Sequence, residues 1–382
     1  MTPSWWAGSG RRRRHSSARR RLAARNGLDT SMTPRENYLR NARRQGPEWM
    51  PCAIGVSGAS RTQLGPDVED VMARYPELFP GFERGQWDYE RTEYGPGHTE
   101  GKQLTDNWGC VWDNAIGGLQ GIVVGHPLAD WEVLGCYMAP NPAEELDVGE
   151  VDWDAVERRL REAAEAGELA RGGVAHGFLF MRLTYLRGFE NLMMDLATDD
   201  PRLARLIEIV QAHNEWLVRK YLSLGVDLVV FGEDLGTQKA SIISPRDFAK
   251  WFTPEYRRLM QPCHEAGALV YLHSDGYVME LMDEFLAAGV DIINPQDLCN
   301  GIDDLAREVK GRMSIALDVD RQSVVPFGSP GEIEELIEEE VRKLGSPEGG
   351  LELVCGIYPP TPVENVDAVC RAMMRMRTYW TA

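Results

Sequence analysis

The sequence has no hydrophobic run long enough to cross a membrane. A membrane-spanning helix needs about 20 mostly apolar residues, and charged or polar side chains interrupt every apolar stretch before that length. The seven cysteines are an odd number, and they form no CxxC motif. We therefore expect reduced thiols in a cytoplasmic protein, with no membrane partner and no disulfide framework.

Several nucleotide-binding and catalytic motifs are also missing. No GxGxxG or GxxxxGK[ST] segment follows an expected strand, and neither GxSxG nor HExxH occurs. A dinucleotide-binding fold, a P-loop and a nucleophile elbow are therefore not indicated. Acidic residues outnumber basic residues by 59 to 41, so the formal charge is −18, and this argues against a nucleic-acid partner.

The first 31 residues differ from the rest of the chain. They contain eight Arg and one Asp, which leaves a charge of −25 on residues 32–382. No apolar segment follows the arginines, so a secretory signal is excluded, whereas a mitochondrial targeting peptide stays open. We predict a disordered tail over residues 1–31 and a single barrel domain over residues 32–382.

Short apolar runs alternate with amphipathic segments through most of the chain. Strands are expected at 49–55, 173–181, 226–231, 269–273, 290–294, 313–317 and 352–356. Helices are expected at 151–168, 188–197, 201–223, 245–264, 276–288, 301–310, 331–344 and 363–378. This alternation predicts an α/β fold with a parallel sheet, and polar residues at several strand ends favour a (βα)8 TIM-type barrel over a doubly wound sheet.

Residues 60–150 do not fit the βα repeat. They are rich in Gly, Pro and aromatic residues, and 105–114 and 117–128 resemble two strands joined by a Gly-Gly turn. We interpret this segment as an insertion over the barrel mouth.

The stretch 225–297 carries the densest set of polar strand ends. His273 and Asp275 end the run LVYL two residues apart, so they share one face of a strand. Cys355 ends the last strand, and Glu233 follows another. Together His273, Asp275, Cys355 and Glu233 are candidate ligands of one divalent metal such as zinc. A hydrogen-bonded histidine and a core cysteine remain the alternative interpretation.

Other residues are candidates for catalysis or substrate binding. The adjacent carboxylates Glu233 and Asp234 could act as general base or metal ligand, or could cap a turn. The substrate-pocket candidates are Trp108, Arg182, Gln238 and Asn294. Arg182 suits a carboxylate or phosphate, although pairing with an acidic residue explains it equally well. His98, His126, His176 and His264 have no partner spacing and are interpreted as structural.

Four segments resemble a known superfamily. GVDLVVFGEDLGTQ, SPRDFAKWFTPEYRRLM, HSDGYVMELMDEFLAAGVDIINPQD and GIYPPTPVENVDAV are similar to the uroporphyrinogen decarboxylase superfamily, over residues 33–380. The closest branch in appearance is that of the corrinoid-dependent methyltransferases. The resemblance implies a (βα)8 barrel with its site at the C-terminal ends of the strands.

The resemblance also implies a reaction. Methyltransferases of this branch bind zinc through His-x-Cys and a later Cys, which maps onto His273, Asp275 and Cys355, with Asp in place of the middle Cys. The decarboxylases bind their substrate through N-terminal arginines, and PEWMPCAIGVSGAS has none. The resemblance thus favours zinc-assisted methyl transfer between a small methoxyl or amine donor and a corrinoid (cobalamin) on a partner protein. A uroporphyrinogen decarboxylase, or a non-catalytic corrinoid- or tetrapyrrole-binding protein, is the alternative, and a homodimer stays open.

Overall fold

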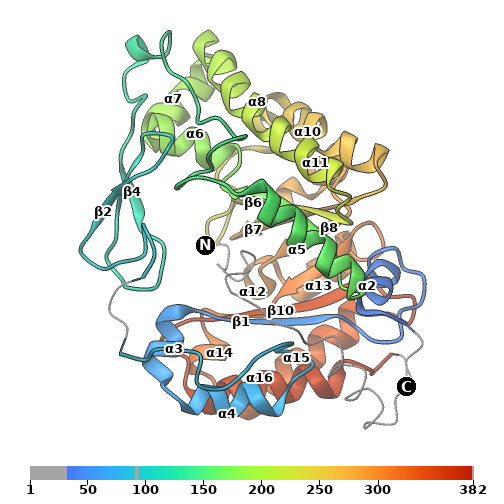
Figure 1. The fold of residues 1–382 in the computed structure, drawn as a ribbon. Coiled ribbons are helices and arrows are strands. Elements are labelled where there is room, and N and C mark those ends of the chain that lie inside the picture. Colours follow the sequence, from blue (N-terminus) through green and yellow to red (C-terminus); the bar gives the residue numbers. More distant parts are fainter. Residues whose placement is uncertain (1–31, 91–93, 381–382) are drawn as a thin grey trace.

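Seven parallel strands form one curled sheet in the computed structural model, which describes residues 32–90 and 94–380 (Figure 1). The predicted Arg-rich tail therefore lies outside the described residues. The order β1-β10-β9-β8-β7-β6-β5 is sequential apart from the return of β1 beside β10, as in a βα barrel. These strands are β1 (Cys52–Val56), β5 (Arg171–His176), β6 (Leu228–Asp234), β7 (Leu269–Asp275), β8 (Ile292–Pro295), β9 (Ser314–Asp318) and β10 (Leu351–Ile357).

The predicted α/β barrel is confirmed, with one difference in its closure. The described sheet has seven strands rather than eight, and β1 and β5 form its two edges. In the sequence the insertion lies between these two strands, where an eighth strand would be expected. The barrel is therefore open along one side in the part of the chain that the structure describes.

Helices cover the outer face of the sheet, with α8, α10 and α11 on one side and α4, α15 and α16 on the opposite side (Figure 1). No helix among the described residues is long and apolar enough to span a membrane. The helices are α2 (Pro34–Ala42), α3 (Gly58–Leu64), α4 (Asp67–Arg74), α5 (Trp153–Glu165), α6 (Phe180–Arg187), α7 (Phe189–Thr198), α8 (Pro201–Ser223), α9 (Pro245–Trp251), α10 (Thr253–Glu265), α11 (Met282–Ala288), α12 (Asp297–Asn300), α13 (Ile302–Glu308), α14 (Val324–Phe327), α15 (Pro330–Leu344) and α16 (Val363–Met376). Two short 3₁₀ turns are η2 (Trp131–Val133) and η3 (Met279–Leu281).

The insertion contains the predicted hairpin. Strands β3 (Val111–Asp113) and β4 (Ile122–Gly125) pair antiparallel, and β2 (Gln103–Thr105) adds a third strand. β3 and β4 are shorter than the two predicted strands, and β2 lies outside the prediction except for Thr105. Arg182 of α6 holds the insertion against the barrel, because its buried guanidinium lies 4.7 Å from the centre of the Trp108 ring and 2.6 Å from Asp147.

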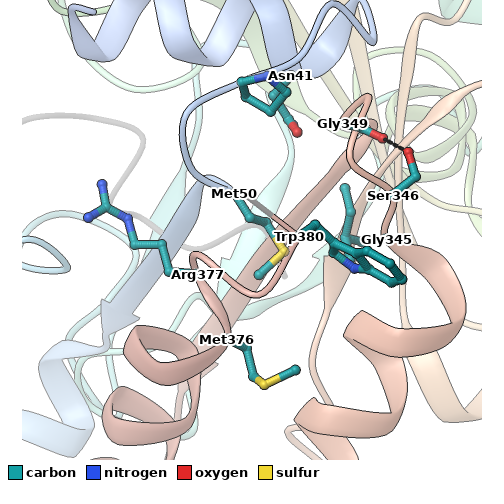
Figure 2. Close-up of a pocket in the computed structure, with 10 residues that line it drawn as sticks. Asn41, Met50, Gly345, Ser346, Gly349, Met376, Arg377 and Trp380 are labelled. Carbon is teal, nitrogen blue, oxygen red and sulfur yellow. Dashed lines mark hydrogen bonds between the residues drawn. The ribbon is translucent and has the colours of Figure 1, made fainter. Parts of the chain in front are cut away.

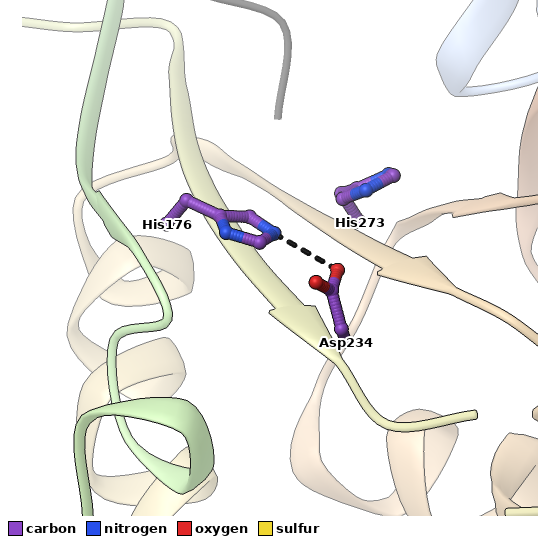
Figure 3. Close-up of side chains that lie close together, drawn as sticks. All are labelled: His176, Asp234 and His273. Atoms are coloured by element: carbon purple, nitrogen blue, oxygen red, sulfur yellow. Dashed lines mark ion pairs between the residues drawn. The ribbon is translucent and has the colours of Figure 1, made fainter. Parts of the chain in front are cut away.

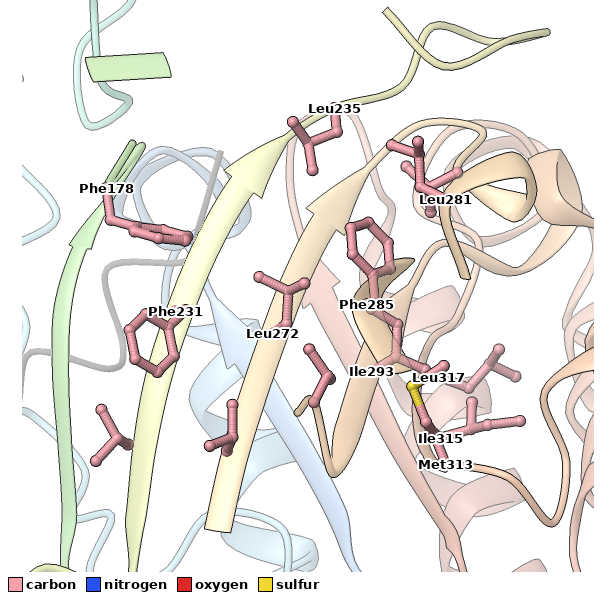
Figure 4. Close-up of a cluster of buried hydrophobic side chains, with 14 of the residues drawn as sticks. Phe178, Phe231, Leu235, Leu272, Leu281, Phe285, Ile293, Met313, Ile315 and Leu317 are labelled. Atoms are coloured by element: carbon pink, nitrogen blue, oxygen red, sulfur yellow. The ribbon is translucent and has the colours of Figure 1, made fainter. Parts of the chain in front are cut away.

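Residue alternation divides the buried side chains into two layers. Side chains such as Leu228, Tyr271 and Val354 point into the barrel, whereas Phe231, Leu272 and other alternate residues pack under the helices (Figure 4). Successive residues of a strand point to opposite faces. Outside the register shift of β5 between Gly173 and His176, a strand residue can therefore be assigned to the barrel interior or to the helix layer from its register.

The strand expected at 173–181 ends earlier than predicted. β5 stops at His176, since Gly177 has a φ of 74°, and helix α6 begins at Phe180. The start of α6 is fixed by Glu233, whose buried carboxylate accepts backbone N–H groups from Leu179, Phe180 and Met181 at 2.7–2.9 Å. Burial raises the pKa of Glu233 to about 8, although the three N–H donors oppose that shift.

A second buried carboxyl group links the helix layer to the mouth of the barrel. Glu340 of α15 is fully buried, and its carboxyl group lies against that of Asp297, at the start of α12. Burial raises the pKa of Asp297 to about 6, and burial together with Asp297 raises the pKa of Glu340 well above its usual value. Asp320 and Glu339 add to the negative surroundings of Glu340. At neutral pH the two groups therefore share a proton.

We predict that Glu233→Ala destabilises the protein by about 2–5 kcal/mol, because three buried N–H groups lose their acceptor. Urea unfolding measures the change. Glu335→Ala, at an exposed position on α15, is the control and should stay within about 0.5 kcal/mol of wild type. Equal stability of the two variants would contradict a role for Glu233 in fixing α6.

We also predict a pH effect for Glu340→Gln. Because the pKa values of Asp297 and Glu340 are raised, the folded protein binds more protons than the unfolded chain above about pH 4, and its stability falls as the pH rises through about 6 and beyond. The amide introduced by Glu340→Gln donates to Asp297 without a bound proton, so the stability of the variant relative to wild type should increase from about pH 5 to 8. Urea unfolding at several pH values measures this change, with Glu335→Gln as the control. If Asp297 and Glu340 did not share a proton, the unfolding free energies of Glu340→Gln and of wild type would depend on pH in the same way.

Candidate metal centre

The site lies at the carboxyl ends of β5, β6 and β7, and its geometry follows from strand register. His176 pairs with Gly232, Gly232 pairs with His273, and Asp234 pairs with Asp275. These residues point into the barrel, with the two histidines in one row and the two aspartates in the next. Since Gly232 has no side chain, the imidazole rings approach across it, with ring centres 5.7 Å apart.

His176, Asp234 and His273 converge on one point (Figure 3). One ligand atom of each lies within 4.8 Å of the other two, and within the described chain this is the group that could hold a metal ion. Nε2 of His176 lies 3.1 Å from Oδ1 of Asp234. Burial lowers the pKa of His176 more than the neighbouring Asp234 raises it. This favours a neutral imidazole, the form that binds metals.

The tautomer of His273 is set by Asn294. The amide nitrogen of Asn294 donates to the carbonyl of Ala316, so its Oδ1 is left to accept the bond from Nδ1 of His273 at 2.7 Å. Nδ1 therefore carries a proton, and the buried Nε2 points toward the centre without a well-directed hydrogen bond among the described residues. An outer hydrogen bond of this kind is typical of metal-binding histidines.

Asp275 stands beside this group as a second carboxylate. Its Oδ1 lies 3.3 Å from Nε2 of His273 and also contacts Arg321. Burial alone would raise the pKa of Asp275, but His273 and Arg321 hold it well below its usual range. Asp318 is also buried, with its Oδ2 3.2 Å from Nη2 of Arg321, and burial raises the pKa of Asp318.

The donor set fits a divalent transition metal. Ligand atoms bound to zinc at about 2.1 Å lie about 3.4 Å from one another. The separations of up to 4.8 Å therefore require only small side-chain shifts. Two imidazole nitrogens and one or two carboxylate oxygens are ordinary ligands of zinc and of iron(II). The two histidine Nε2 atoms are buried and lack well-directed hydrogen bonds, as expected for a site that binds an ion.

Two predicted ligands are placed elsewhere. Cys355 is fully buried in the layer beneath the helices, whereas its neighbour Val354 faces the barrel interior. Glu233 also points out of the barrel, toward the start of α6. The structure thus brings neither residue to His273, and it supplies His176 and Asp234 instead. The physical reason is strand alternation: an offset of one residue moves a side chain to the opposite face.

The four substrate-pocket candidates lie in different surroundings. Trp108 donates its indole N–H to Asp147 at 2.8 Å, and Arg182 pairs with Asp147 and lies 3.7 Å from Asp106. Both belong to the contact between the insertion and α6. Gln238 is exposed in the loop after β6, and Asn294 orients His273. Their binding of a substrate stays a prediction.

The sequence pattern predicts a structural role for His176 and carries no signal for Arg321, yet the structure places both residues at the site. The signal for His176 is that VAHG ends β5 in the way that HSDG ends β7, with a glycine of positive φ after each strand. Arg321 follows β9 by three residues, and no spacing rule connects it to Asp275. Only the barrel brings these two residues together.

Two cavities in the described part of the chain lie away from this site. One, of about 10 Å³, is lined by Met50, Met376, Trp380 and neighbours near the carboxyl-terminal end of α16 (Figure 2). That volume accommodates a single water molecule at most. The other, of about 450 Å³, is an open hollow along α8 between Ala212 and Lys220.

The fold matches a solved methyltransferase from Methanosarcina mazei. The TM-score is 0.64, the identity is 16%, and the match covers 90% of this chain and 99% of that chain. A 3-keto-D-glucoside 4-epimerase from E. coli (TM-score 0.37, 14% identity, 60% and 88% covered) and a B12-independent methionine synthase from Shewanella sp. W3-18-1 (0.36, 10%, 60% and 70%) are more distant. At these identities the first match establishes the fold, and nothing is inferred from the other two.

The sequence itself decides the family. No curated protein matches the chain. The sequence pattern of uroporphyrinogen decarboxylase (URO-D) matches residues 130–376, which is well over half of the chain and includes every strand from β5 to β10. The chain therefore belongs to the uroporphyrinogen decarboxylase family.

Proposed function

We propose that this protein is a metal-assisted methyltransferase, which moves a methyl group from a small methoxyl or amine donor to a corrinoid. The supporting observation is the convergence of His176, Asp234 and His273 at the carboxyl end of a URO-D barrel. The overall match to a methyltransferase barrel fits this proposal. Zinc is the metal we propose, with Asp275 as a further ligand.

The residues of the site have separable roles in this proposal. His176, Asp234, His273 and Asp275 would hold the metal, which when bound supplies a Lewis acid that polarises the heteroatom carrying the methyl group. Asn294 accepts the N–H of Nδ1 of His273 and so orients the ring with Nε2 toward the proposed ion. Two ionised carboxylates and two neutral imidazoles balance the charge of a divalent cation.

The wall beside Asp234 is apolar and could exclude water. Met181 of α6 accepts the backbone N–H of Asp234 through its sulfur at 3.1 Å, and the hydroxyl of Tyr185 lies 3.8 Å from the same sulfur. Tyr185 also packs edge-on against Trp112 of the insertion, with ring centres 5.0 Å apart. We propose that α6 and the insertion together shield the reacting groups, which protects a reactive methyl acceptor from side reactions.

A decarboxylase remains the second candidate because of the family match. The mouth of the barrel argues against it, since Asp234, Asp275 and Asp318 line it and Arg321 is paired with two of them. A polycarboxylate tetrapyrrole would meet repulsion there, and its acid groups would lack partners. The charge of the site therefore favours the methyltransferase proposal.

We predict about one equivalent of zinc per chain, measured by elemental analysis after zinc loading and desalting. His176→Ala and His273→Ala should each lower the metal content strongly, because each removes one nitrogen ligand. Cys355→Ala and His98→Ala, the latter in the insertion, are the matched controls and should keep full occupancy. A metal-free wild type, or loss of metal in Cys355→Ala alone, would contradict this ligand set.

We also predict that zinc-loaded protein forms methylcobalamin from cob(I)alamin and a donor in a panel of methoxylated compounds and methylamines. His273→Ala should lower kcat/KM by about 100-fold or more, because the polarising charge is lost. The absorption spectrum of the corrinoid follows the reaction. Stepwise loss of carboxyl groups from uroporphyrinogen, without methyl transfer, would instead establish the decarboxylase.

A further inference from the structure

Arg321 is a cation in direct contact with Asp275, at the edge of the candidate metal centre. It follows β9 and is almost fully buried. Its guanidinium contacts Asp275 and lies 3.2 Å from Asp318 and 5.4 Å from the centre of the Tyr358 ring. Asp275, Asp318 and Tyr358 come from three different strands or strand ends, so the side chain bridges the mouth of the barrel.

The backbone that carries Arg321 is held firmly. Asp320 accepts backbone N–H groups from Gln322, Ser323 and Val324, which closes a tight turn around Arg321. The N–H of Asp320 donates to Asp297 at 2.8 Å, and Asp297 in turn lies against Glu340 of α15. The backbone turn that carries Arg321 is therefore anchored, through Asp320, to α12 and α15.

The same residue limits where Asp275 can point. One carboxylate oxygen of Asp275 lies between Arg321 and Nε2 of His273. A short carboxylate side chain with free rotation could turn toward solvent, since Asp275 is the more exposed partner of this pair. The guanidinium holds the oxygen toward His273 through Nη2, which also lies 3.2 Å from Asp318, and a rigid, planar group suits this better than a flexible ammonium group.

We propose that Arg321 is a positioning residue of the metal centre, which acts through Asp275 by holding its carboxylate toward the ion. The proposal rests on the proposed metal site. It assigns to this chain an outer partner of a metal-binding carboxylate, of the kind whose loss weakens metal binding by about 10–100-fold. Asp318 balances the charge of the guanidinium when Asp275 is engaged by the ion.

The test is a double-mutant cycle on metal affinity, measured by competition between the protein and a chromophoric chelator for Zn²⁺. Arg321→Met should weaken zinc binding by about 10–100-fold, and Asp275→Asn should weaken it by a similar or larger factor. If Arg321 acts through Asp275, adding Arg321→Met to Asp275→Asn should change the affinity little further. Arg321→Lys should recover only part of the affinity, and Arg312→Met, at a surface ion pair with Asp283, is the control.

The outcomes distinguish failure of the proposed metal site from failure of the role proposed for Arg321. A wild type that binds no zinc would remove the proposed function and this proposal together. Wild-type affinity in Arg321→Met, or equal losses from Arg321→Met in the presence and absence of Asp275, would overturn only the role of Arg321. The visible spectrum of the Co²⁺-substituted protein gives a second readout, because a displaced carboxylate changes the coordination geometry whereas a merely less stable fold does not.

Discussion

The pairing of β6 with β7 is the constraint on which the site depends. Seven consecutive residues pair in parallel register, from Leu228 with Leu269 to Asp234 with Asp275. This register places Gly232 beside His273 and both aspartates in the next inward row. A shift of one residue would move Asp234 under the helices and Glu233 into the barrel. The buried acceptor role of Glu233 at α6 opposes such a shift, so the start of that helix and the candidate metal centre are fixed by the same pairing.

Much of the fold could be predicted from periodicity, since alternating apolar strands and amphipathic helices determine a parallel α/β barrel. The Asp200-Pro201 start of α8 and the Thr33 cap of α2 lie where local chemistry places them. The end of β5 was harder, because GVAHGFLFM is apolar on both sides of Gly177. Only the positive φ of that glycine separates strand from helix. The open edge between β1 and β5 could not be predicted either, because no local pattern shows that a strand is absent from the described sheet.

The residues of the candidate site also fall into two groups, those that a local sequence pattern predicts and those that only the folded barrel brings to the site. His273 and Asp275 were predictable as a pair, because two residues apart on one strand is a local relation. Cys355 could not be assigned to a face, because the inward set on β10 depends on its register with β9, where Val354 pairs with Asp318. His176 and Arg321 lie some 100 and 50 residues from His273 and Asp275 in the sequence. Their roles follow from barrel closure and from a turn held by Asp320, and neither can be derived from one segment.

The absence of a thiolate near His273 among the described residues has a consequence for chemistry. Thiolate ligands transfer more charge to zinc than carboxylates do, so a centre of imidazoles and carboxylates leaves the ion a stronger Lewis acid. Such an ion suits the polarisation of an oxygen or nitrogen that bears a methyl group better than the binding of a soft sulfur. Hard ligands also hold the metal less tightly, so the orientation of each carboxylate matters more for affinity. In this barrel Arg321 contacts Asp275, and the turn that carries Arg321 is hydrogen-bonded through Asp320 to Asp297, which lies against Glu340 of α15. The contact between α15 and α12 is therefore coupled, through a charged side chain, to the part of the site where the metal is proposed to bind.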